Sequence, residues 1–172
     1  CLSLIFIDKV VNYVGETPII KNLFEEKYKK IFKEFNGSEP SSEHLLSIQG
    51  YYFAQNSKGE FADNEGGIKQ QKEIYDAILR DKEEILRFGD STANKIEFIF
   101  SHSALGVGWD NPNVFQICTL KDTSNEIKKR QEVGRGMRLC VNDKGERQDA
   151  DVLGDHVFDT NILTVIASES YA

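Results

Sequence analysis

The sequence has few of the residues that mark secreted, zinc-binding or membrane-spanning proteins. It holds only three cysteines, three prolines, one tryptophan and one methionine in 172 residues. The cysteines, at positions 1, 118 and 140, are odd in number and lack metal-ligand spacing, so neither a disulfide framework nor a metal site is predicted. No run of eighteen apolar residues is present to span a membrane, and no leader peptide pattern is found. We therefore expect a cytoplasmic chain with free thiols and no membrane contact.

Several nucleotide and nuclease motifs are also missing. There is no Gly-x-x-x-x-Gly-Lys-Ser/Thr phosphate loop, since residues 15–22 imitate its spacing but lack the second glycine and the terminal hydroxyl. No Asp-Glu-x-His/Asp box follows an apolar strand, and no Pro-Asp…Glu-x-Lys nuclease centre is found. The dinucleotide motif Gly-x-Gly-x-x-Gly is absent after the first apolar run. The chain alone is therefore not expected to hydrolyse ATP or to cleave nucleic acid.

Length and charge favour a single acidic domain with one basic segment. The 172 residues suffice for one domain, and we treat 1–172 as one unit. Because Cys1 runs directly into an apolar strand, we expect the chain to be a piece of a longer protein. The net charge of −7 argues against a protein that coats nucleic acid non-specifically. Residues 121–138, however, carry a net charge of +3 against −10 for the remainder.

Apolar runs alternate with helical patterns along the chain. Strands are predicted at residues 2–7, 48–54, 96–100, 114–120 and 162–167. Helices are predicted from a Thr17-Pro18 start to Gly37, over 74–86, and from a Thr123/Glu126 capping box to about Met137. Loops are predicted at 37–43 and 56–67, and a polar turn at 142–148. This alternation predicts a three-layer α/β domain with a mostly parallel sheet.

The segment after the predicted strand 96–100 reads Ser-His-Ser-Ala-Leu-Gly-Val-Gly-Trp-Asp-Asn-Pro. Ligands of parallel sheets bind beyond the carboxyl ends of strands, and this segment begins at such an end. Gly106 and Gly108 allow backbone amides to approach a ligand closely. Asp110 offers a carboxylate to ribose hydroxyls. The alternative is a loop whose glycines only make turns, and a lone His102 is more often structural than catalytic.

A second segment, Gln-Glu-Val-Gly-Arg-Gly-Met-Arg, follows the next predicted strand. On a helix, Gln131, Arg135 and Arg138 would share one face, because they are four and three positions apart. Two guanidinium groups on one face can hold a polyphosphate and stabilise charge on a transferring phosphoryl group. The alternative is a solvated basic helix face. Gly134 and Gly136 argue against it, because each costs about 1 kcal/mol in a helix interior.

These two segments resemble a known family. Gln-x-x-Gly-Arg-x-x-Arg resembles motif VI of superfamily-two helicases, and Gly-x-Asp-x-Pro resembles motif V. More closely, Phe-Ser-His-Ser-Ala-Leu, Gly-Trp-Asp-Asn-Pro-Asn-Val-Phe-Gln-Ile-Cys-Thr-Leu and Arg-Gln-Glu-Val-Gly-Arg-Gly-Met-Arg-Leu look like the restriction (Res) subunit of type III restriction–modification enzymes. The terminal Leu-Thr-Val-Ile-Ala-Ser-Glu-Ser-Tyr does as well. The resemblance is dense over residues 96–171 and looser over 1–95.

The resemblance implies the second of two RecA-like lobes in an ATP-driven motor. Its site residues would be Arg135 and Arg138 as arginine fingers, Gln131 facing the nucleotide, Asp110 on the ribose, Gly108 in the motif V loop, and Ser101, His102 or Ser103 on the nucleic-acid backbone. ATP and Mg²⁺ would be bound mainly by the N-terminal lobe. One departure is visible, because Gly106-Val107 replaces a charged pair that is common in the family. A contact to the backbone or to the other lobe is expected to be weaker in consequence.

The same resemblance implies partners and leaves alternatives. The partners would be double-stranded DNA, the N-terminal RecA-like lobe and the methyltransferase (Mod) subunit, with a nuclease centre beyond Ala172. The equivalent lobe of a repair or RNA helicase is one alternative. A nucleic-acid-binding module with an inactive ATPase is another, and a dinucleotide enzyme fits the fold class without its motif. Residues 36–67 have no predicted role.

Overall fold

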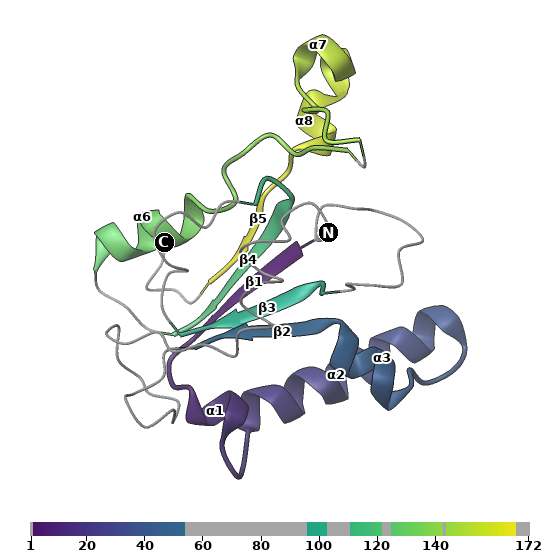
Figure 1. Cartoon of the computed structure of the whole chain (residues 1–172), viewed down its shortest axis with the longest axis vertical. Coiled ribbons are helices and arrows are strands. Elements are labelled where there is room, and N and C mark those ends of the chain that lie inside the picture. The colour runs from purple at the N-terminus through teal and green to yellow at the C-terminus, as the bar shows by residue number, and fades with distance from the viewer. Residues whose placement is uncertain (1, 54–95, 103–110, 122–124, 143, 168–172) are drawn as a thin grey trace.

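A computed structural model describes residues 2–53, 96–102, 111–121, 125–142 and 144–167 of the chain. Its five strands form one sheet in the order β2-β3-β1-β4-β5, and every neighbouring pair is parallel (Figure 1). The strands are β1 (Leu2–Ile7), β2 (Gln49–Tyr52), β3 (Phe98–Ser101), β4 (Val114–Leu120) and β5 (Thr164–Ile166). The predicted α/β fold with a parallel sheet, as in RecA-like domains, is confirmed.

The first strand occupies the centre of the sheet and is buried along its whole length. All six residues of β1 are buried, as expected for an apolar strand covered on both faces. Phe6 lies beside Ser101 of β3 and Thr119 of β4 in the sheet register. The carboxyl ends of these three strands therefore meet at one edge of the sheet, which is called the carboxyl edge below.

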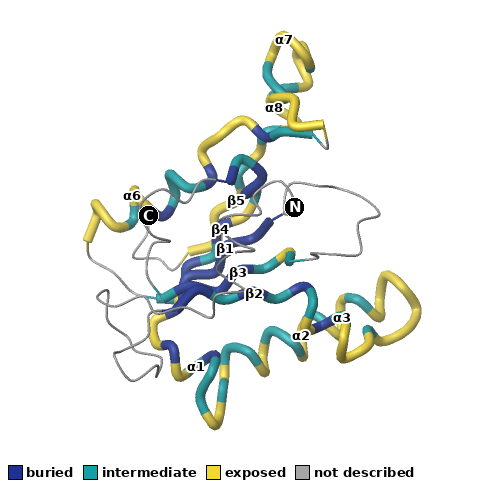
Figure 2. The backbone as a smooth tube through the Cα atoms, in the orientation of Figure 1, coloured by how far each residue is buried: buried dark blue, intermediate teal, exposed yellow. Residues whose placement is uncertain are grey.

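The two faces of the sheet carry separate apolar clusters. Leu4, Phe6 and Ile117 belong to one cluster, while Ile5 and Phe100 belong to the other. This division follows from the alternation of side chains along a strand. Figure 2 shows the buried residues concentrated in the strands between the flanking helices.

Helical segments cover both faces of the sheet. The helices α1 (Val11–Val14), α2 (Ile19–Asn36) and α3 (Ser42–Ser47) connect β1 to β2, and α6 (Glu126–Val133) follows β4 on the way to β5 (Figure 1). The ring of Phe24 on α2 lies 5.2 Å from that of Phe100, which defines the α2 face. The connection from β1 leads to β2, at one side of the sheet, and the connection from β4 leads to β5, at the other side. Right-handed crossovers in opposite directions lie on opposite faces of a sheet.

The ends of α2 agree only in part with the prediction. The N-cap is Pro18, without a side-chain cap hydrogen bond, so the predicted cap at Thr17 is wrong. The helix ends at Asn36, and Gly37 follows with a φ of 74°, as predicted. The predicted loop 37–43 is too long, because α3 begins at Ser42 and is capped by the hydroxyl of Ser41. The predicted loop 56–67 and helix 74–86 lie outside the described residues.

Replacement of Gly37 by alanine is expected to lower the free energy of unfolding by about 1 kcal/mol. The left-handed backbone at this position disfavours any residue with a Cβ atom. Among the described residues, no atom would lie within 4 Å of a Cβ atom added here, so the loss comes from backbone conformation and not from a clash. Urea unfolding of the chain measures it. Gly37→Asn should lose less, and equal stability of the alanine variant would contradict the explanation.

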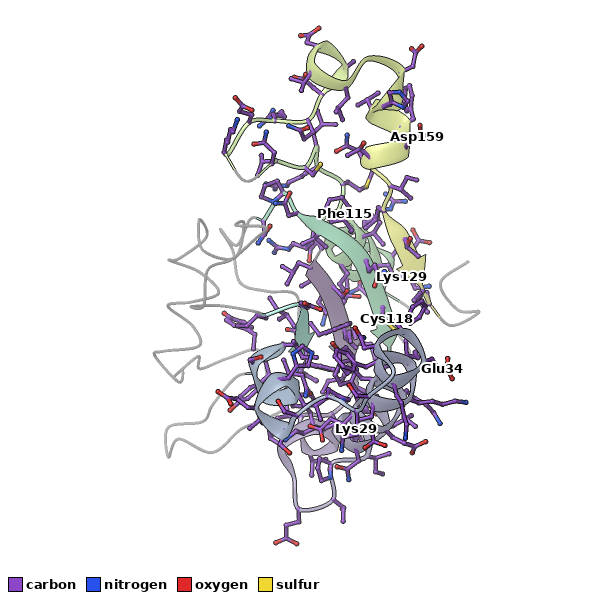
Figure 3. The ribbon with its side chains drawn as sticks, turned by 90° about the vertical axis from the view of Figure 1, so that its right-hand side faces the viewer. Lys29, Glu34, Phe115, Cys118, Lys129 and Asp159 are labelled. Carbon is purple, nitrogen blue, oxygen red and sulfur yellow. The ribbon has the colours of Figure 1, made fainter. Side chains whose placement is uncertain are left out.

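The segment between α6 and β5 extends away from the sheet. It contains α7 (Ala150–Leu153), the short 3-10 turn Gly154–His156 and α8 (Val157–Thr160). In Figure 3, Asp159 on α8 lies at the opposite end of the molecule from Lys29 and Glu34 on α2. The Gly145 turn predicted at 142–148 is present, with Val141 and Arg147 bridged in antiparallel fashion.

Both described cysteines are free thiols with limited exposure to solvent. Cys118 is half-buried in β4, and Cys140 is buried before the Gly145 turn. Burial raises the pKa of each thiol, which favours the protonated and unreactive form. No helix within the described ranges is long and apolar enough to cross a membrane.

Candidate nucleotide and nucleic-acid site

The helix that carries Gln131 is shorter than predicted. Its N-cap is Asn125, whose side chain accepts a hydrogen bond from the Lys128 amide at 3.1 Å, in place of the predicted Thr123. The helix α6 ends at Val133 with Gly134 as its C-cap. The predicted continuation to about Met137 is therefore wrong.

The two candidate arginines consequently lie beyond the helix. The amides of Arg135 and Gly136 donate to the carbonyls of Glu132 and Val133, at 3.2 and 3.0 Å, in a tightened final turn. Two glycines in three positions explain the early end of the helix, because glycine has a low helix propensity. Gln131, Arg135 and Arg138 thus do not share one helical face. Gln131 and Arg138 are exposed, while Arg135 is half-buried.

Gly136 fixes this turn, which we call the arginine turn (residues 134–138), against the sheet. A Cβ atom at Gly136 would lie 3.2 Å from Cδ1 of Ile117, and closer still to the side chain of Leu163. The absence of a side chain therefore permits the close approach of the turn to β4 and to the residue preceding β5. This contact is on the face opposite α2, which we call the α6 face.

Replacement of Gly136 by alanine is expected to lower the free energy of unfolding by about 1–3 kcal/mol, as overpacking does in well-packed sites. The added methyl group would force Leu163 and Ile117 apart from the arginine turn. Urea unfolding measures the loss. The matched test is the double variant Gly136→Ala/Leu163→Ala, which should lose less than the two single variants combined. Additive losses would contradict a direct clash.

Two asparagines hold the chain directly after the arginine turn. The Asn161 side chain accepts a hydrogen bond from the Cys140 amide at 2.8 Å, and Asn113 accepts one from the Val141 amide at 2.9 Å. Asn113 directly precedes β4, and Asn161 lies shortly before β5. The chain therefore leaves the carboxyl edge in α6 and passes through the arginine turn toward the amino ends of β4 and β5. Neither asparagine was among the residues predicted from the sequence.

The other predicted contacts lie at the end of β3. Ser101 is buried, and its hydroxyl donates to the Tyr52 carbonyl at 3.3 Å. His102 is half-buried at the carboxyl edge. Three of the predicted site residues, Ser103, Gly108 and Asp110, lie outside the described residues.

Lys121, which entered the sequence-based prediction only as a positive charge, lies between two of the candidate segments without being a predicted contact. Its ammonium Nζ lies 2.5 Å from Oε1 of Glu132 on α6 and donates to the His102 carbonyl at 3.2 Å. The same nitrogen lies 5.3 Å from the centre of the Phe6 ring. The lysine side chain is 13% exposed and that of Glu132 is 1% exposed. This buried ion pair connects the end of β3 to the helix that leads into the arginine turn.

The charges of the described site suit an anion better than a cation. Guanidinium groups such as those of Arg135 and Arg138 match the oxygens of a polyphosphate. Within the described ranges, no group of three or more His, Cys, Asp and Glu side chains is placed to bind a metal ion. Arg135 and Arg138 are therefore of the residue type that pairs with phosphate oxygens.

Comparison with known proteins finds three similar curated proteins, and no family model matches the chain. It is 37% identical to the type III restriction-modification enzyme EcoP15I Res subunit of Escherichia coli and 41% identical to the EcoPI Res subunit of Escherichia phage P1, over 155 residues in each case. It is 35% identical to the StyLTI Res subunit of Salmonella typhimurium over 161 residues. These alignments cover 83–85% of the chain.

The chain spans only 15–16% of the length of these curated relatives. The similarity therefore concerns one region of much longer proteins. It includes enough of the chain to extend well beyond the two short motifs that first suggested a relationship. The chain is related to a region of the Res subunit of type III restriction-modification enzymes.

Proposed function

We propose that the chain is the second motor lobe of an ATP-dependent DNA translocase or helicase of superfamily two, within a type III restriction enzyme. The observation that carries this proposal is the 35–41% identity to three Res subunits over most of the chain. The five-stranded parallel sheet supports it, because motor lobes of the RecA-like type use such a sheet. The whole enzyme would be a site-specific endonuclease, and this lobe alone would be inactive.

In this proposal, ATP binds between this lobe and an N-terminal lobe that carries the phosphate loop. Arg135 and Arg138 hold the γ-phosphate and stabilise the charge that develops on it during hydrolysis. Their place on a turn suits this role, because a turn held at both ends can present a guanidinium group to a partner lobe. Mg²⁺, when bound by the other lobe, neutralises phosphate charge. Gln131, Asp110 and Gly108 contribute the remaining nucleotide contacts.

Nucleic acid is proposed to bind along the carboxyl edge of the sheet. His102 and the neighbouring Ser101 and Ser103 follow β3 at this edge, where parallel sheets bind their ligands. Since Ser101 is buried and its hydroxyl bonds to Tyr52, His102 is the better placed of the two described residues. Closure and opening of the two lobes with ATP binding and hydrolysis would shift the grip on DNA. Sequence recognition is assigned to a methyltransferase (Mod) partner.

The test measures the rate of ATP hydrolysis by the full-length protein that contains both proposed motor lobes. The rate is compared with duplex DNA, with single-stranded RNA and without nucleic acid. Stimulation by duplex DNA is expected. Stimulation by RNA alone would favour an RNA helicase of the same superfamily. Binding of DNA without any hydrolysis would favour a nucleic-acid-binding module, and either of these results would overturn the proposed function.

A further inference from the structure

The buried Lys121 joins two segments to which the proposed function gives different ligands. Its bond to the His102 carbonyl reaches the end of β3, the proposed nucleic-acid side. Its ion pair with Glu132 reaches α6, the proposed nucleotide side. Both contacts use one ammonium group, so movement of either segment changes the geometry of the other contact.

The position of Glu132 makes this connection direct. Its backbone carbonyl accepts the hydrogen bond from the Arg135 amide at 3.2 Å, so it belongs to the last turn before the arginine. The chain thus runs from the His102 carbonyl through the Lys121 ammonium and the Glu132 carboxylate to the backbone of Arg135. Two side chains and one backbone hydrogen bond therefore link the two proposed contact regions.

The chemistry of the pair is unusual for a role in packing alone. Removing an ammonium and a carboxylate from water carries a large desolvation penalty, and apolar residues of similar volume often fill such space as well or better. The Lys121 ammonium lies over the ring of Phe6, which belongs to the apolar cluster of the α6 face, so an apolar residue such as methionine or leucine is the relevant comparison. An ion pair differs from such a residue in being directional, because it holds the His102 carbonyl and the Glu132 carboxylate at defined positions.

We propose that Lys121 is a positioning residue that couples the end of β3 to the arginine turn, so that nucleic acid bound at the carboxyl edge promotes ATP hydrolysis. The inference rests on the proposed function of the two segments. Lys121 touches neither ligand in this proposal. It transmits the position of one segment to the other through its two partners.

The test uses the complete protein with four variants and measures DNA-stimulated kcat, KM for ATP, the DNA-independent rate and Tm. Lys121→Met alone leaves Glu132 buried without its partner and is expected to lower Tm. The double variant Lys121→Met/Glu132→Met removes both charges and should recover most of that loss. Lys121→Arg keeps the charge and the donors. Glu132→Gln keeps the lysine and its bond to His102.

The double variant is expected to lose about tenfold in stimulation by DNA, while KM for ATP and the DNA-independent rate stay within about twofold of wild type. Lys121→Arg and Glu132→Gln should each retain more stimulation than the double variant. A folded double variant that is stimulated like wild type would overturn the inference, because the pair would then serve stability alone. A leucine pair replaces the methionine pair where that variant does not fold.

Failure of the proposed function gives a different result. If wild-type protein shows no stimulation of ATP hydrolysis by DNA, the proposed function falls, and the coupling role falls with it. If wild type is stimulated and the double variant is equally stimulated, only the coupling role of Lys121 falls.

Discussion

Replacement of Arg138 by alanine is expected to lower DNA-stimulated ATP hydrolysis by about 10³-fold or more in the complete motor protein. Loss of an arginine that stabilises the transferring phosphoryl group removes an interaction made mainly in the transition state. The variant should therefore show a lower kcat with a smaller change in KM for ATP. Because Arg138 is exposed, its replacement should leave Tm close to that of wild type. Steady-state hydrolysis with and without duplex DNA measures the effect.

Arg130→Ala is the matched control for this variant. Arg130 lies on α6, and its side chain is 83% exposed in an ion pair with Glu126 at 3.6 Å. Exposed pairs of this kind contribute little to stability. Because Arg130 is not among the residues proposed to contact ATP or nucleic acid, hydrolysis should change by less than about twofold. Arg135→Ala is expected to behave like Arg138→Ala. If the Arg138 variant hydrolyses ATP at the wild-type rate, the arginine-finger assignment is wrong and a binding module becomes the better explanation.

Replacement of Phe6 by alanine is expected to lower the free energy of unfolding by about 3–5 kcal/mol. The side chain is fully buried at the centre of the sheet, so its removal leaves a cavity in the apolar cluster on the α6 face. For a domain of this size the loss corresponds to a decrease in Tm of about 6–20 °C. It is a large fraction of the roughly 5–15 kcal/mol that stabilises most domains. Thermal and urea unfolding of the chain measure it.

Phe35→Ala provides the control with the same chemical change. Phe35 on α2 is 85% exposed, so its removal opens no cavity. Its stability should stay within about 0.5 kcal/mol of wild type, as for most surface substitutions. Similar losses in the two variants would contradict the placement of β1 at the centre of the core.

The positions of the strands were predictable because each strand lies in a run of mostly apolar residues. Two of them, β1 and β4, have the predicted bounds. All six residues of β1 are buried, as expected for an apolar strand covered on both faces, whereas β4 mixes buried with exposed positions. The end of α2 was predictable for a similar reason, because a left-handed C-cap strongly favours the glycine found at position 37. The start of α2 was not, because Thr17 and Pro18 can both begin a helix in more than one register.

The site residues stay a prediction, and the geometry expected from their spacing was wrong. The spacing of Gln131, Arg135 and Arg138 suggested one helical face, yet the glycines between them end the helix first. Lys121 and Asn113 were missed because their roles depend on partners far along the chain. Asn113 bonds to an amide 28 positions away, and Lys121 bonds to a carbonyl 19 positions away. Sequence patterns within a few neighbouring residues cannot predict contacts over such separations.

The central position of β1 has a consequence for how the chain reaches its native state. Its neighbours are β3 and β4, and Ser3 donates a hydrogen bond to the side chain of Gln116 across 113 positions. A ribosome therefore releases the most apolar strand of the sheet long before either neighbour exists. Parallel pairings at such separations form slowly, and the unpaired strand is meanwhile open to association with other chains. We expect the yield of native protein to rise when a chaperone shields this segment during synthesis.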